Sequence, residues 1–209
     1  MMIEDFGARV ASVWEGLRST TRNLLEKALQ SSVAGSANMQ PARAEGRPYD
    51  ARADWELSRL LAALDERAAE AGASLNAEQV KELRRMADTT AVVLQGQTQS
   101  AEVFEQLVAR AHRLYDFARI DQLADTLSAR FAPSEICELV RSYDVVVRAL
   151  ALEALAQAPT SVLVGLLVDP IDSEIAREAL ERQANEYDSE DARRIVNVLD
   201  QADVAEDDL

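Results

Sequence analysis

The chain has few of the residues from which disulfides, metal sites and catalytic centres are usually built. Among its 209 residues there is one cysteine, Cys137, and one histidine, His112. A single cysteine excludes an intrachain disulfide. One histidine, with no second histidine and no cysteine near it in sequence, supplies neither a metal site nor a nucleophilic triad. We therefore predict no metal, no cofactor and no catalytic residue.

Positive charge and long apolar runs are also scarce. The chain has 22 basic and 37 acidic residues, a formal net charge of −15, and Lys27 and Lys81 are its only lysines. This balance disfavours nucleic acid and anionic membrane surfaces, which bind through basic faces. The apolar run 162–168 is far too short to span a bilayer, and residues 1–10 do not follow the pattern of a signal peptide. We therefore expect no membrane span and a cytoplasmic protein.

Glycine and aromatic residues are few, whereas alanine and leucine are abundant. Alanine and leucine have the highest helix propensities. No stretch alternates Val, Ile and Thr with polar residues, as a half-buried strand would. The composition therefore predicts an all-α fold.

A self-match organises the second half of the chain. Residues 133–183 superimpose on themselves when shifted by about 28 positions, so that Leu139 meets Leu167 and Asp144 meets Asp172. Each copy reads as a short helix, an acidic turn and a second helix, and the same frame extends weakly over 101–200. A fixed period with two helices per copy is typical of a helical solenoid.

The copy YDVVVRALALEAL (143–155) resembles the second half of a HEAT repeat, with Asp144 in the turn and Val147-Arg148 after it. VDPIDSEIAREAL (168–180) is similar, although Ala176 stands where Arg148 predicts arginine. The resemblance implies stacked hairpins and a packing face. Members of this family mostly serve as scaffolds and binding surfaces.

The segments before the repeats differ in character. Residues 1–30 form one amphipathic helix pattern, and 31–50, rich in Ser, Ala, Gly and Pro, is typical of a flexible linker. The body is expected at 51–200, with a helical hairpin at 51–95 and HEAT-like units at 101–200. An acidic tail follows at 201–209. The predicted fold is therefore a stack of antiparallel helical hairpins, a short HEAT-like α-solenoid, preceded by an amphipathic helix on a linker.

Several local features can be checked in a structure. Asn76 with Gln79 predicts a capping box at a helix start, and Trp55 falls on the apolar stripe of the helix around it. Cys137 lies between apolar residues and is expected to be a buried structural thiol. The repeat frame places His112 at the position of Val140, Val168 and Val196, which predicts a partly buried histidine.

The predicted function is protein–protein binding, as an adaptor or scaffold subunit without catalysis. The partner is another protein or a second copy of the chain, because the linker would let the first helix dock away from the body. Two alternatives remain: an accessory enzyme or lyase with a site in a groove between hairpins, and a regulatory domain that responds to divalent cations. The candidate partner-binding residues lie on the apolar face of the first helix: Phe6, Val10, Val13, Trp14 and Leu17.

Overall fold

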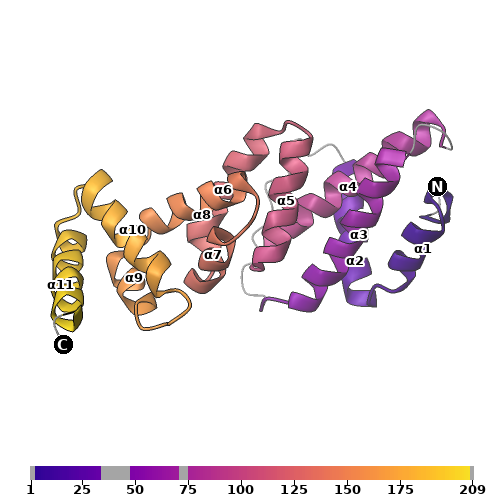
Figure 1. The fold of residues 1–209 in the computed structure, drawn as a ribbon. Coiled ribbons are helices and arrows are strands. Elements are labelled where there is room, and N and C mark those ends of the chain that lie inside the picture. The colour runs from indigo at the N-terminus through magenta and orange to yellow at the C-terminus, as the bar shows by residue number, and fades with distance from the viewer. Residues whose placement is uncertain (1–2, 34–47, 71–74, 208–209) are drawn as a thin grey trace. The chain divides into compact units, whose positions relative to one another are not determined.

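The computed structural model describes residues 3–33, 48–70 and 75–207, and within these ranges the chain is helical and contains no strand (Figure 1). The prediction of an all-α protein is therefore confirmed. In chain order the elements are η1 (Ile3–Phe6), α1 (Ala8–Glu15), α2 (Ser19–Val33), α3 (Ala51–Glu70), α4 (Ala77–Gln97), α5 (Ala101–Arg113), α6 (Phe117–Arg130), α7 (Pro133–Val140), α8 (Val145–Ala156), α9 (Thr160–Leu166), α10 (Ser173–Glu186) and α11 (Glu190–Asp207).

The chain divides into two compact units, Met1–Leu107 and Val108–Leu209. The boundary falls within α5, so the first unit contains α1 to α4 and the start of α5. The second contains the end of α5 and all helices from α6 onward. The first helices of the chain thus share a unit with the residues around 51–95. Most of the predicted linker, 34–47, and residues 71–74 within the predicted hairpin lie outside the described residues.

In the first unit α1 packs against α3, α2 packs against α4 and α3, and α3 packs against α4. The prediction of one continuous helix over residues 1–30 is wrong. The helix α1 ends at Glu15 with Gly16 as its C-cap, and α2 begins at Ser19. Glycine has a low helix propensity, and the break lets both segments turn an apolar face to the same core. Leu17 in the break and Leu25 in α2 are buried.

The two long helices of the first unit bear out one local prediction and correct two others. Asn76 and Gln79 form the predicted capping box at the start of α4. Trp55 does not face the core, because its side chain is 54% exposed and stacks under the Arg59 guanidinium at 4.8 Å. The helix α4 also continues past residue 95, the predicted end of the hairpin, to Gln97. The buried side of α3 is instead formed by leucines, namely Leu57, Leu60, Leu61 and Leu64.

In the second unit the helix starts follow the repeat frame. Pro133 is the first residue of α7, where its missing N–H costs nothing. Asp116 caps α6, Asp144 caps α8, and Asp172 stands at the N-cap position of α10. The helix α7 packs against α8 and α9, α8 against α6 and α10, and α10 against α9 and α11. The expected acidic tail is helical from Gln201 to Asp207, because α11 continues through it.

The two chemically distinctive residues of this half have different environments. Cys137 is fully buried, as predicted, and burial together with the Asp172 carboxylate raises the pKa of its thiol to about 11. The prediction for His112 is wrong, because its side chain is exposed. It lies in the last turn of α5, one residue past the buried Ala111, and a step of about 100° around the helix turns it to solvent. Val168, at the matching position, is 87% exposed.

Candidate functional site

Of the five residues predicted to bind a partner, three are buried inside the first unit. Phe6 and Val10 are each 1% exposed and Leu17 is 5% exposed. These side chains already pack against the unit's own helices, so they present no surface to a partner in this conformation. Val13 and Trp14 are partly exposed. The binding role of this helix therefore stays a prediction that concerns two residues instead of five.

Trp14 is held by its own neighbours. The Arg22 guanidinium lies 5.5 Å from the centre of the indole ring, and Arg22 Nη2 donates to the carbonyl oxygens of Trp14 at 3.1 Å and Glu15 at 3.2 Å. The same arginine thus covers the aromatic face and satisfies carbonyls at the end of α1. It ties α2 to α1 across the break at Gly16.

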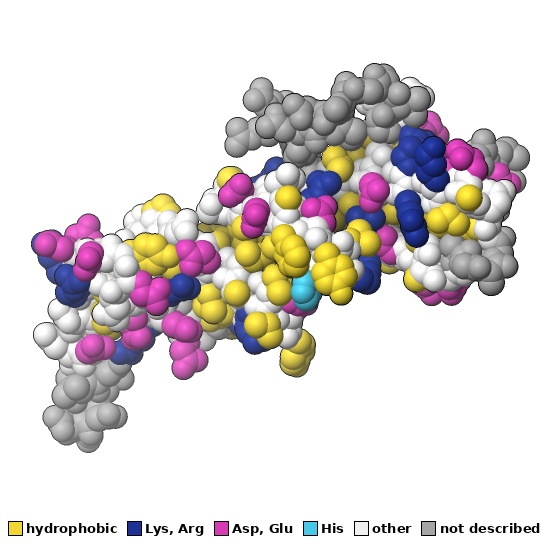
Figure 2. Space-filling model, turned by 90° about the horizontal axis from the view of Figure 1, so that it is seen from above, with side chains coloured by type: hydrophobic (Ala, Val, Ile, Leu, Met, Phe, Trp, Pro, Cys, Tyr) yellow, Lys and Arg dark blue, Asp and Glu magenta, His cyan; other side chains and the backbone are white. Residues whose placement is uncertain are grey.

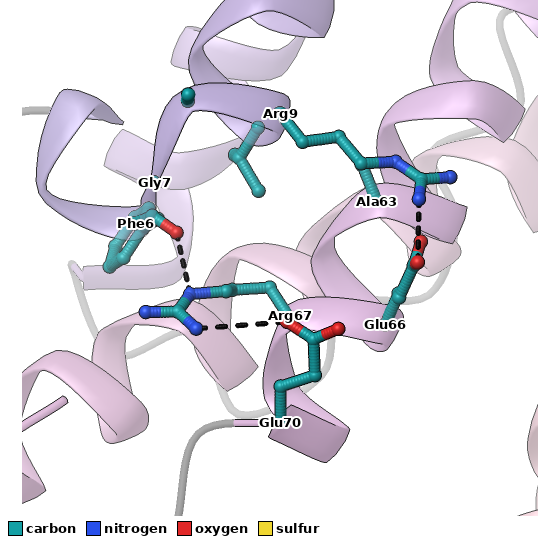
Figure 3. A pocket seen from close by; sticks show the side chains of 9 residues that line it. Phe6, Gly7, Arg9, Ala63, Glu66, Arg67 and Glu70 are labelled. Carbon is teal, nitrogen blue, oxygen red and sulfur yellow. Dashed lines mark hydrogen bonds and ion pairs between the residues drawn. The ribbon is translucent and has the colours of Figure 1, made fainter. Parts of the chain in front are cut away.

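A pocket of about 390 Å³ lies between the start of α1 and α3 (Figure 3). Arg67 Nε donates to the Phe6 carbonyl oxygen at 2.8 Å, and Arg9 pairs with Glu66 at 2.5 Å. Gly7 has φ +109°, a conformation that L side chains rarely adopt. The polar groups that line the pocket already interact with one another, and these interactions hold α1 against α3. The lining consists of Phe6, Gly7, Ala8, Arg9, Val10, Ala63, Glu66, Arg67 and Glu70.

A buried carboxylate joins α2 to α3. Glu56 is 3% exposed and accepts hydrogen bonds from Thr21 Oγ1 at 2.5 Å and from the Arg18 backbone N–H at 3.2 Å and Nε at 3.0 Å. Burial alone raises the pKa of Glu56, but the hydrogen bonds from Thr21 and Arg18 outweigh it and hold the pKa below its usual range. The Arg18 guanidinium also bridges to Asp50 at 2.9 Å. This network is a structural tie between helices.

Asp54, which lies before Glu56 in α3, has a pKa shifted in the opposite direction. Its carboxylate is 1% exposed and accepts from Tyr49 Oη at 3.0 Å and Gln97 Nε2 at 2.9 Å. Here desolvation exceeds the stabilising hydrogen bonds, so the pKa of Asp54 is raised. A raised carboxyl pKa also occurs at catalytic sites, but Asp54 does not line the pocket between α1 and α3. It joins the start of α3 to the end of α4.

The largest set of exposed apolar side chains lies elsewhere, in the three turns α5–α6, α7–α8 and α9–α10 of the second unit. Tyr143 is fully exposed, Tyr115 is 79% exposed and Ile171 is 72% exposed. Hydrophobic side chains are visible at the surface of one face in Figure 2. Such exposure is costly in water and is typical of interaction surfaces when the side chains gather. We refer to the following residues as the turn surface: Leu114, Tyr115, Phe117, Tyr143, Val145, Val168 and Ile171.

Hydrogen bonds fix the backbone beneath the turn surface. Asp144 Oδ1 accepts from the N–H groups of Val146 at 2.8 Å and Val147 at 3.3 Å. Arg141, at the end of α7, donates to the Ile171 carbonyl oxygen at 2.7 Å and pairs with the buried Asp172 carboxylate. Arg141 therefore links the α7–α8 turn directly to the α9–α10 turn, so these two turns lie side by side.

Tyr115 is strained as well as exposed. Its φ is +55°, in the left-handed region, where a bulky residue costs about 1–2 kcal/mol relative to a right-handed conformation. Asn or Gly would satisfy the same turn without that cost. The fold gains little packing from the tyrosine, since most of its ring is in water.

Sequence reasoning missed the turn surface, although a signal for it was present. Tyr115, Tyr143 and Ile171 each immediately precede an aspartate of the repeat frame, namely Asp116, Asp144 and Asp172. A large apolar residue beside a turn aspartate in every copy is a pattern that core packing does not require. A search for apolar residues at turn positions of the frame would have found it.

Two other kinds of site, a metal centre and a membrane span, find no support in the described residues. In the part of the chain that the structure describes, no group of three or more His, Cys, Asp or Glu residues is placed to hold a metal ion. No single helix there has the length and hydropathy to cross a membrane; α8 and α9 reach them only together and are bent by 113° at the break. The chain matches no family model, and neither a curated protein nor a solved structure is detectably similar to it.

Proposed function

We propose that the chain is a non-catalytic protein-binding module and that its binding site is the turn surface of the second unit. In this proposal residues 101–200 form a short HEAT-like stack of helical hairpins. The partner contributes a segment whose apolar side chains cover Tyr115, Tyr143 and Ile171. Large aromatic side chains are the residues that contribute most to protein–protein binding energy.

Tyr115 is the observation that carries the proposal. A residue that is both strained and 79% exposed lowers the stability of the free protein. Backbone strain at a non-glycine residue concentrates at functional sites, where another requirement maintains it. Contact with a partner is such a requirement, because binding removes the tyrosine ring from water.

The repeated geometry supports the same conclusion. Three consecutive turns each carry an exposed apolar side chain at the residue before the turn aspartate, so this exposure recurs at one position of the repeat frame. Asp116 and Asp144 cap the helices behind these anchors, and Arg141 fastens the second turn to the third. A backbone that is fixed before binding loses less entropy when a partner binds.

The test is site-specific photo-crosslinking in cells that express the full chain. A photoreactive phenylalanine analogue replaces Tyr143 in one version and Trp55, an exposed aromatic residue of the first unit, in the control. We expect a discrete protein adduct from position 143, and its loss when Tyr115→Asn and Ile171→Ser are added. No adduct, equal adducts from both positions, or an adduct that survives those substitutions would contradict the proposal.

A further inference from the structure

We infer that the segment received by the turn surface is positively charged, an amphipathic stretch with Lys or Arg beside its apolar side chains. This inference rests on the proposed function. The charge of the chain is concentrated in the second unit, where residues 108–209 contain ten arginines, no lysine and 21 acidic residues, a formal charge of −11. The first unit has 12 basic and 16 acidic residues, a formal charge of −4.

At least five of the ten arginines of the second unit pair with carboxylates of the same unit. Arg182 pairs with Glu153 at 3.1 Å and with Glu186 at 2.7 Å. Arg177 pairs with Glu181 and Asp200, and Arg141 pairs with Asp172. Because acidic residues outnumber arginines about two to one, these pairs leave a large excess of carboxylates for a partner to meet.

Part of that excess lies beside the turn surface. Glu138 precedes the α7–α8 turn, Asp169 lies within the α9–α10 turn and Glu174 is in the first turn of α10, and all three side chains are exposed. Asp169 also accepts from the Ile171 N–H at 2.8 Å, which places a carboxylate next to an apolar anchor. The first turn differs, since His112 and Arg113 precede Tyr115 there. The acidic side of the surface is therefore at its second and third turns.

This charge distribution selects among possible occupants. A second copy of the chain would bring another unit of charge −11 against the first, and like charges oppose association. A neutral apolar segment would cover the anchors but leave the carboxylates without partners. A basic amphipathic segment matches both the apolar anchors and the carboxylates. Its apolar groups would lie on Tyr143 and Ile171, and its cations would lie opposite Glu138, Asp169 and Glu174.

The experiment measures binding of two fluorescent probe peptides to the full chain by anisotropy. One is a short amphipathic leucine–lysine peptide, and the other has glutamate at each lysine position. The charge variant is Asp169→Asn with Glu174→Gln. Its matched control is Asp125→Asn with Asp188→Asn, which removes the same charge outside the three turns of the turn surface; Asp188 lies between α10 and α11 and has φ +52°, which asparagine tolerates. The apolar variant is Tyr143→Ser with Ile171→Ser.

We expect the lysine peptide to bind and the glutamate peptide not to bind. The charge variant should weaken binding of the lysine peptide roughly three- to tenfold, the range that two exposed ion pairs contribute, and the control less than about twofold. Equal binding of both peptides, no binding of the lysine peptide, or equal losses in the charge variant and its control would overturn the inference. If both peptides bind the parent chain and the apolar variant binds neither, the proposed function stands and only the inference about charge fails. If the apolar variant binds the lysine peptide as well as the parent chain does, the result counts against the proposed function itself.

Discussion

The two units place their polar and apolar side chains in opposite ways. Among the described residues, seven of the nine buried polar side chains belong to the first unit, while ten of the twelve large exposed apolar side chains belong to the second. The first unit closes its core with buried hydrogen bonds such as those of Glu56 and Asp54. The second packs mainly Ala, Leu and Val and leaves apolar residues at its turns. Stability thus depends on different interactions in the two halves, and among the described residues the large exposed apolar side chains are concentrated in the second unit.

The largest expected effect tests the apolar core of the second unit. Leu155 in α8 has no exposed surface, so Leu155→Ala leaves a cavity and should lower the free energy of unfolding by about 2–5 kcal/mol. Val145→Ala, in the same helix but 67% exposed, should change it by about 0.5 kcal/mol or less. Denaturant unfolding, together with hydrogen exchange of amides in each unit, measures both. Similar values for the two variants would show that the core is not close-packed around Leu155.

The next effect tests the polar network of the first unit. Glu56→Ala leaves Thr21 and the cations of Arg18 and Arg52 without their buried acceptor and should cost about 3 kcal/mol. Hydrogen exchange should speed up in the first unit and not in the second. If protection in the first unit is unchanged, the network does not hold α2 to α3.

The same carboxylate should make the first unit sensitive to acid. The folded pKa of Glu56 lies below its unfolded value, so its contribution is complete above the unfolded pKa and is lost as pH falls through the folded pKa. Glu56→Gln should remove this dependence, which a series of unfolding measurements between neutral and acidic pH would detect.

Asp54 should have a pH dependence of the opposite sign. Its folded pKa is raised, so its stabilising contribution is present below the unfolded pKa and is lost as pH rises through the folded pKa.

The smallest effect has the opposite direction and tests the strain in the turn surface. Tyr115→Asn should raise the free energy of unfolding by about 1 kcal/mol, because asparagine tolerates the left-handed conformation better than tyrosine. Tyr143→Asn is the matched control, since Tyr143 is fully exposed but does not have a positive φ. Its effect should stay within about 0.5 kcal/mol. A loss of stability in Tyr115→Asn would mean that the tyrosine supports the fold and is not retained for binding.

Local features of the sequence predicted local features of the structure. The scarcity of glycine and the abundance of alanine and leucine predicted the helical class, and the pair Asn76 and Gln79 predicted the cap of α4. The aspartates of the repeat frame stand where α6, α8 and α10 begin. These predictions succeed because helix propensity and capping depend on residues within a few positions of one another.

Whether a side chain is buried depended instead on which helices meet. The apolar pattern of the first helix could equally well contact a partner or the chain's own core. In the structure Phe6, Val10 and Leu17 pack inside the first unit. His112 fell on the frame position of three valines, yet it is exposed because it lies one helical step past the buried Ala111, which turns it to solvent. The sequence by itself determined the helical class and several helix starts, but not the break between α1 and α2 at Gly16. Only the tertiary structure decided which apolar residues have neighbours, and it left those of the turn surface without them because no described helix packs over the turns.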